Sequence, residues 1–225
     1  MNEPSFQKHL YYLNSQIYDL YSLLKQQNAE INNYSLSKIF EYWSCLQLSK
    51  QYQEPFNVYE DIDEDIKLER AMTKHDTGID FANEKLQQIG QAKLRKTRLS
   101  WREISTFAAH LGFQYSQNPD VQGLLTYNTG ITLHPQLEKY STINPYYFRA
   151  LAYDKSEMVS YCEQLIQQSN KFKVNYRRET FAKGYEMRYY QRDCVDFIRK
   201  SIQNTENTEN TESTEQNGAI VRMPT

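Results

Sequence analysis

The spacing of apolar residues along the first fifty positions predicts two helices. Between residues 6 and 33 apolar side chains recur every three or four positions, and Gln and Asn fill the other face. We expect this stretch to form a docking helix or a small helical hairpin. A second helix is predicted over residues 35–50 and is apolar around most of its circumference. Glu41 shares a partly apolar face with Cys45 and Leu48, which is unusual for an acid that only meets solvent.

The next hundred residues alternate between strand and helix patterns. Two strands at 78–82 and 88–93, joined by a polar turn at 83–85, predict a β-hairpin. The other expected elements are an extended stretch at 55–59, a short helix at 66–72, a helix at 101–111 capped by Ser100 and Glu103, strands at 121–127 and 147–153, and a helix at 156–169. This order predicts an α/β fold, a mixed sheet flanked by helices.

Composition changes sharply towards the end of the chain. Residues 204–217 form an almost regular three-residue repeat of Asn, Thr and Glu without an apolar side chain, so we expect this insert to be disordered. The predicted organisation is an N-terminal helical extension (1–33), a main domain (34–170), a connector and helix (171–203), the insert (204–217) and a final strand (218–225).

Charge and composition exclude several classes of protein. The 225 residues carry 26 Lys and Arg against 28 Asp and Glu, so any nucleic-acid contact must come from a local patch. No apolar run is long enough to span a membrane, and the N-terminus lacks the pattern of a signal peptide, which predicts an intracellular protein, cytoplasmic or nuclear. Three scattered cysteines and four scattered histidines do not suggest a zinc site.

The predicted hairpin brings chemically useful groups together. Gln91 and Lys93 are two residues apart on one strand, so their side chains leave the same face. Pairing of the two strands can place Asp80 beside them. A carboxylate and an amide oxygen can ligate Mg²⁺ or Mn²⁺, and an ammonium group can stabilise a negative transition state. Glu41 could add a ligand from its helix, so these four residues are the candidate catalytic set for phosphodiester hydrolysis.

Together, these residues resemble a known family. The segment from Asp76 to Asp80, the Gln91-Ala-Lys93 half-motif and Glu41 on a preceding helix are similar to the PD-(D/E)xK nuclease superfamily, in its Mrr-like restriction endonuclease branch that carries Gln in place of an acid. The likeness covers residues 34–155, and Gly78-Ile79 stands where other branches have a proline before the aspartate. It implies a restriction-endonuclease-like mixed sheet flanked by helices, in which Asp80, Gln91 and Glu41 hold the metal and Lys93 completes the motif.

Simpler interpretations stand beside this one. A Gly-Ile-Asp sequence on a hairpin is often only a turn with a surface acid, and a lone Gln-x-Lys is common; the joint spacing with Glu41 is what favours a site. Asp76 is more typical of a turn than of a metal site, and His75 of a surface side chain.

The stretch from Lys93 to Arg102 holds five cations and no acid. Because it directly follows the candidate catalytic strand, Arg95, Lys96, Arg98 and Arg102 are expected to contact DNA phosphates. The alternative is a solvated basic loop. Trp101 could stack on a base, although its place at the start of an amphipathic helix favours packing in the core.

Two segments near the C-terminus resemble parts of superfamily-2 helicases. Residues 187–198 are similar to the Q motif, in which Gln191 would read adenine in a nucleotide, and residues 218–225 resemble the strand that leads into a phosphate-binding loop. The loop itself, GxxxxGK[ST], does not occur, so the chain is not expected to be an ATPase by itself. This order is similar to the N-terminal piece of a truncated nuclease-helicase, with the missing helicase domains as possible partners.

Three functions therefore remain open from the sequence. The first is a Mg²⁺- or Mn²⁺-dependent DNA endonuclease domain, and the second is a catalytically silent DNA-binding or docking module of a helicase. The third is an assembly module that uses the N-terminal helix and a tyrosine-rich surface.

Overall fold

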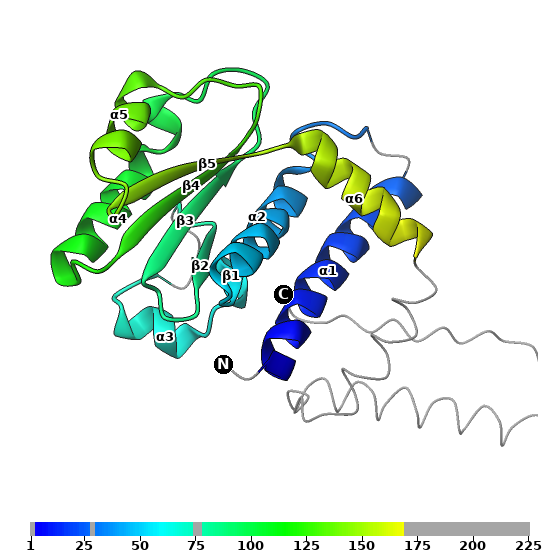
Figure 1. Ribbon diagram of the computed structural model, residues 1–225, viewed down its shortest axis with the longest axis horizontal. Coiled ribbons are helices and arrows are strands. Elements are labelled where there is room, and N and C mark those ends of the chain that lie inside the picture. The colour runs from blue at the N-terminus through cyan, green and yellow to red at the C-terminus, as the bar shows by residue number, and fades with distance from the viewer. Residues whose placement is uncertain (1–2, 28–29, 74–77, 169–225) are drawn as a thin grey trace, which may run out of the picture. The chain divides into compact units, whose positions relative to one another are not determined.

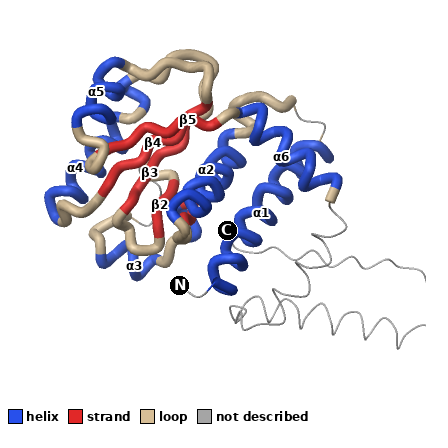
Figure 2. The backbone as a smooth tube through the Cα atoms, in the orientation of Figure 1, coloured by secondary structure: helices blue, strands red, loops and turns tan. Residues whose placement is uncertain are grey.

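A five-stranded mixed β-sheet with helices on both faces organises the part of the chain that the structure describes (Figures 1 and 2). The computed structural model describes residues 3–27, 30–73 and 78–168, within a unit that spans Met1–Lys173. Its elements are α1 (Glu3–Gln26), α2 (Ser37–Tyr52), β1 (Phe56–Val58), the 3-10 turn η1 (Tyr59–Asp61), α3 (Glu64–Glu69), β2 (Phe81–Asn83), β3 (Gln88–Lys93), η2 (Trp101–Glu103), α4 (Ser105–Gln117), β4 (Gln122–Asn128), α5 (Pro135–Ile143), β5 (Phe148–Tyr153) and α6 (Lys155–Gln167).

The strands lie in the sheet in the order in which they occur in the chain. β1, β2 and β3 pair antiparallel, whereas β3, β4 and β5 run parallel, with Lys93 beside Tyr127 in the register of β3 and β4. The helices α4 and α5 make the two parallel crossovers and cover the same face of the sheet (Figure 1). The α/β fold class, a mixed sheet flanked by helices, is confirmed.

Two hydrophobic cores lie on opposite faces of the sheet, because neighbouring residues on a strand point to opposite sides. On β4, Leu124 belongs to the core beneath α1, α2 and α6, and Leu125 to the core beneath α4. Figure 1 shows these two groups of helices on either side of the sheet. A central strand covered on both faces is apolar on both, which explains why the sequence of β4 lacks a polar alternation.

Helix α1 contributes directly to the first of these cores. Leu13, Ile17 and Tyr21 are fully buried there, and the Tyr21 hydroxyl donates a hydrogen bond of 2.6 Å to Glu163 on α6. Burying one such side chain is worth roughly 1.5–3 kcal/mol. The N-terminal residues expected to form an extension therefore pack into the same core as the sheet.

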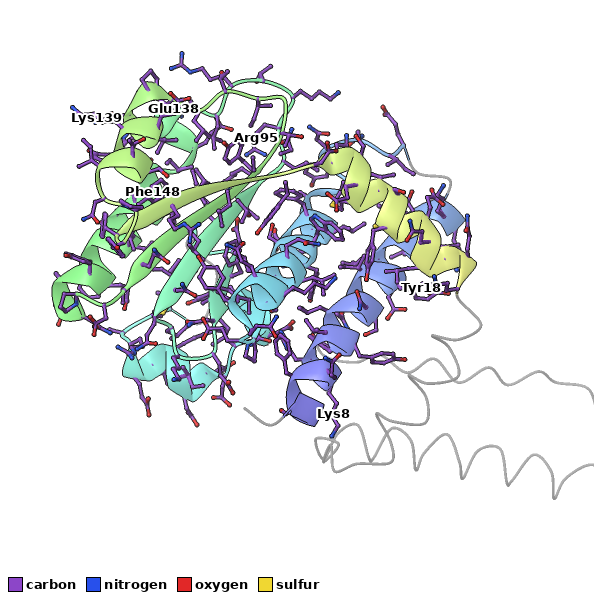
Figure 3. The ribbon with its side chains drawn as sticks, viewed as in Figure 1. Lys8, Tyr18, Arg95, Glu138, Lys139 and Phe148 are labelled. Atoms are coloured by element: carbon purple, nitrogen blue, oxygen red, sulfur yellow. The ribbon has the colours of Figure 1, made fainter. Side chains whose placement is uncertain are left out.

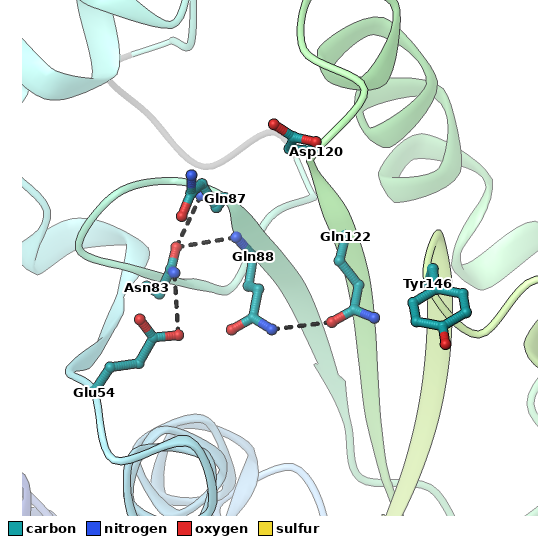
Figure 4. Close-up of a pocket in the computed structure, with 7 residues that line it drawn as sticks. All are labelled: Glu54, Asn83, Gln87, Gln88, Asp120, Gln122 and Tyr146. Atoms are coloured by element: carbon teal, nitrogen blue, oxygen red, sulfur yellow. Dashed lines mark hydrogen bonds between the residues drawn. The ribbon is translucent and has the colours of Figure 1, made fainter.

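The hairpin of β2 and β3 is fixed at its turn by one amide side chain. The Asn83 Oδ1 atom accepts hydrogen bonds from the backbone amides of Gln87 and Gln88 at 2.9 and 3.0 Å. Next to it, Gln88 Nε2 donates to Gln122 Oε1 at 3.0 Å and ties β3 to β4 (Figure 4). This polar network at the turn end sets the register that decides which residues meet at the other end.

Gly90 on β3 allows the hairpin to close. A Cβ atom built there would lie 2.1 Å from the Phe81 ring and 2.8 Å from the Leu124 carbonyl oxygen. Only glycine accommodates an aromatic ring lying across the backbone in this way. Phe81 can therefore pack in the first core while its neighbour Asp80 remains paired with β3.

One described helix was absent from the expectations. α5 begins after His134, whose Nδ1 accepts from the Gln136 amide at 3.2 Å, and Pro135 occupies its first turn. Only Leu137 of this helix is buried, so its apolar pattern is too weak for periodicity to reveal it. Among the described residues, no helix is both long and apolar enough to cross a membrane.

Candidate active site

The end of the hairpin opposite its turn brings Asp80 and Lys93 together. The Asp80 backbone is held on both sides, since its amide donates to the Gly90 carbonyl at 2.8 Å and its carbonyl accepts from the Tyr59 amide at 2.9 Å. The Asp80 Oδ2 atom accepts a hydrogen bond of 2.7 Å from the Ala92 amide and lies 3.6 Å from Lys93 Nζ. Both side chains are largely buried, at 9% and 15% exposure, so this pair is far less screened than a surface ion pair.

Glu41 reaches the same region from α2. Its side chain is 19% exposed and accepts a hydrogen bond of 2.7 Å from Lys38 Nζ. Burial raises the pKa of Glu41 to about 7; the hydrogen bond from Lys38 works against this rise, and the negative charge of Asp80 adds to it. The charge of Asp80 therefore reaches the Glu41 carboxylate and makes its ionisation less favourable.

Lys38 is a site residue that the sequence analysis missed. Its ammonium group bridges Glu41 and Glu60, with contacts of 2.7 and 2.8 Å to the two oxygens of Glu60. Although burial disfavours its charge, the bonds to these two carboxylates hold the pKa of Lys38 above its ordinary value. The signal was present in the sequence, because residues three apart on a helix are neighbours.

A pocket of about 760 Å³ opens beside these groups. Tyr34, from the loop before α2, lies at this pocket and is 91% exposed. The residues that line the pocket are Glu30, Asn32, Asn33, Tyr34, Ser37, Glu41, Asp80, Ala92, Lys93, Leu94, Arg95 and Lys96. It lies where the parallel strand β3 ends, a position at which α/β proteins commonly bind ligands.

Gln91 is placed differently from the other three candidate residues. It is not among the residues that line the pocket, and only 4% of its surface is exposed. Within the described part of the chain, its Oε1 atom is buried without a hydrogen-bond partner. Leaving an acceptor in this state costs about 1–3 kcal/mol, and such an atom in a native fold calls for a functional or solvent partner.

These donors fit a hard divalent cation, although sparsely. Carboxylate oxygens from Glu41 and Asp80 and the unpaired amide oxygen of Gln91 are the ligand types that Mg²⁺ and Mn²⁺ prefer. Over the described residues, no three His, Cys, Asp or Glu side chains gather into a metal-binding group. A metal held at the pocket would therefore rely on carboxylates and water, and Gln91, which does not line the pocket, would have to turn towards it to contribute its amide oxygen.

In the basic segment after β3, one cation is paired with an acidic side chain and three are exposed to solvent. Arg95 Nε donates to Glu103 Oε1 at 2.6 Å, and the Arg95 amide donates to Asn128 Oδ1 at 2.7 Å (Figure 3 labels Arg95). The predicted capping of the following helix is found as well, with the Ser100 amide and hydroxyl donating to Glu103. The cations of this segment that are exposed to solvent are Lys96, Arg98 and Arg102.

Several predicted features lie outside the described residues. These are His75, Asp76, Gln191 of the expected Q motif, the insert at 204–217 and the strand at 218–225. The helicase relationship therefore stays a prediction.

Comparisons with protein-family models, with curated proteins and with solved structures found no match for this chain.

Proposed function

We propose that this chain is a Mg²⁺- or Mn²⁺-dependent DNA endonuclease of the PD-(D/E)xK type, in its Mrr-like branch. The observation that supports this most directly is the 3.6 Å approach of Lys93 Nζ to Asp80 Oδ2, beside a pocket that Glu41 also lines. Had the two side chains pointed to opposite sides of the sheet, the resemblance would have lost its chemical meaning. The five-stranded mixed sheet is compatible with such a fold.

Each residue of the proposed site has a distinct role. Asp80, Glu41 and Gln91 would hold the cation, which when bound neutralises phosphate charge and lowers the pKa of water. Lys93 presents a positive point charge at the pocket, where it can stabilise negative charge that develops on a phosphate. Its ammonium group is held in place by Asp80 rather than by a flexible surface contact. The exposed cations Lys96, Arg98 and Arg102 would bind the neighbouring backbone phosphates.

Lys38 would position Glu41 rather than meet the substrate. It fixes one oxygen of that carboxylate and is itself anchored by Glu60 on the outside of the pocket. With one oxygen of Glu41 held by Lys38, the other oxygen is also restricted in position. Less conformational entropy is then lost when a cation binds.

Plasmid nicking in Mg²⁺ or Mn²⁺ tests the proposal. We expect nicking by the wild-type chain and its loss, by at least about a hundredfold, in Lys93→Met and in Asp80→Asn, which retains an acceptor for the Ala92 amide. Two substitutions of the same kinds far from the site, Lys85→Met in the hairpin turn and Asp120→Asn before β4, serve as matched controls. Equal nicking by all five proteins would refute the assignment.

A catalytically silent DNA-binding module is the second candidate. The observation that favours it is the shortage of gathered acidic ligands: over the described residues no three His, Cys, Asp or Glu side chains form a metal-binding group, and Gln91 is a neutral amide. In that case DNA binding would survive Asp80→Asn and weaken steeply with salt. It would be lost when the exposed cations Lys96, Arg98 and Arg102 are replaced by Gln.

A further inference from the structure

A second pocket, on the other face of the sheet, lies between α4 and α5. Its volume is about 500 Å³, and most of its walls are apolar or aromatic. Leu137 and Phe148, both buried, lie on its inner side, whereas Tyr140 is 43% exposed at its outer side. The lining residues are Trp101, Ile104, Ser105, Ala108, Ala109, Leu111, Leu137, Tyr140, Tyr147 and Phe148.

The hollow exists because one wall is built from small side chains. Ser105, Ala108 and Ala109 lie on one side of α4, while the facing side carries aromatic rings. Trp101 and Tyr140 pack against each other with ring centroids 5.9 Å apart and an interplanar angle of 53°. The expected packing of Trp101 in the core is therefore only part of its environment, because the half-buried indole also borders open space.

The basic segment connects this pocket to the candidate active site. Lys96 lines the active-site pocket and Trp101 lines the aromatic one. Trp101 follows Lys96 by five positions, so their Cα atoms lie at most about 18 Å apart. A few nucleotides of single-stranded DNA can span this distance. Arg98 lies between them and Arg102 directly after, both exposed. Over the described residues, neither arginine forms an ion pair.

We propose that the aromatic pocket between α4 and α5 takes an unpaired DNA base, so that the substrate class of the proposed nuclease is DNA with single-stranded or extrahelical nucleotides. The inference names the substrate of the proposed function and rests on it for the cleavage step. Aromatic walls stack on any base, and cations at the edge neutralise the adjoining phosphates, which is the combination that single-stranded DNA requires. A base within an intact duplex cannot enter a pocket of this kind unless it is flipped out of the stack.

Fluorine NMR of the wild-type chain labelled with 5-fluorotryptophan gives a direct test. The chain has two tryptophans, so Trp43, which is only 3% exposed in the first core, serves as an internal control in the same sample. Trp101→Phe assigns the second signal. In EDTA, where no cleavage occurs, we expect a short oligodeoxythymidylate to shift the Trp101 signal upfield by ring stacking. The blunt duplex of the same length should leave both signals in place.

Filling the pocket tests the same idea without touching a cation or a ring. Ala108→Leu should weaken oligonucleotide binding at least about fivefold, the lower end of what one stacked base contributes. Gly112→Ala is the matched control, because a Cβ atom there meets nothing within 4 Å on the same helix. We expect it to bind like the wild type.

The outcomes separate this inference from the proposed nuclease activity. A Trp101 shift without cleavage of either plasmid or single-stranded DNA in Mg²⁺ or Mn²⁺ would support the pocket and refute the nuclease. Nicking without a Trp101 shift, or equal binding by Ala108→Leu, would refute the pocket. If the aromatic pocket instead buries a second copy of the chain, analytical ultracentrifugation would show a dimer that Ala108→Leu disrupts, and this result would also overturn the proposal.

Discussion

The buried carboxylate of Glu41 should make folding stability depend on pH in an unusual direction. Because burial, with the charge of Asp80 added, raises the pKa of Glu41 from 4.5 to about 7, the folded state retains a proton there that the unfolded state releases. The stability that protonated Glu41 contributes is fully present below pH 4.5 and is lost as the pH rises through 7. At about 1.4 kcal/mol per pH unit, the loss is roughly 3 kcal/mol by pH 8.

Urea unfolding, followed by tryptophan fluorescence at a series of pH values in EDTA, measures this loss. Glu41→Gln cannot ionise and keeps an acceptor for Lys38, so we expect the difference in unfolding free energy, variant minus wild type, to grow by about 3 kcal/mol between pH 4.5 and 8. Added Mg²⁺ should reduce the difference, because a bound cation stabilises the ionised carboxylate. A difference that stays constant across this range would refute the reasoning.

Three further predictions concern stability alone. Gly90→Ala should lower the free energy of unfolding by about 2–4 kcal/mol in urea titrations, and by clearly more than Gly123→Ala, because its Cβ atom meets backbone while the other meets only a leucine side chain. Gly112→Ala should raise it by about 0.5–1 kcal/mol, since an exposed position of α4 loses its flexible glycine; an unchanged denaturation midpoint would contradict this. Although burial opposes the shift, bonds from Arg95 and Ser100 lower the pKa of Glu103 to about 2, so stability contributed by this carboxylate above pH 4.5 is lost on acidification towards pH 2. Glu103→Gln should accordingly lose less stability than the wild type between those values in the same titrations.

Local signals were enough to predict much of the fold. Alternating or continuous apolar runs identified β3, β4 and β5 to within a residue or two, and Ser100 with Glu103 gave the start of the helix after β3. The weakly apolar α5 could not be predicted, since its formation depends on its single buried residue, Leu137, packing against the sheet. The limits of β2 also needed the structure, because strand ends are set by the pairing partner rather than by propensity.

The candidate site was predictable where it depends on register and unpredictable where it depends on side-chain partners. Strand pairing predicted the approach of Asp80 to Lys93, and a residue count along the hairpin was sufficient for it. The engagement of Arg95 with Glu103 and the bridging of Glu41 by Lys38 are choices among several possible partners. Helical spacing marks Lys38 and Glu41 as neighbours, but tertiary packing decides which of the possible partners pair.

β3 has an antiparallel neighbour on one side and a parallel neighbour on the other. Residues within β3 are therefore held in register from both sides, whereas the residues after it are not. Lys93 is anchored within the paired strand, whereas the chain that carries Lys96 and Arg98 has already left the sheet. Insertions or exchanges after Lys96 would move the exposed cations while the lysine and its aspartate remain in register. Affinity for a ligand could thus be altered, in the laboratory or in evolution, by lengthening one loop without rebuilding the hairpin.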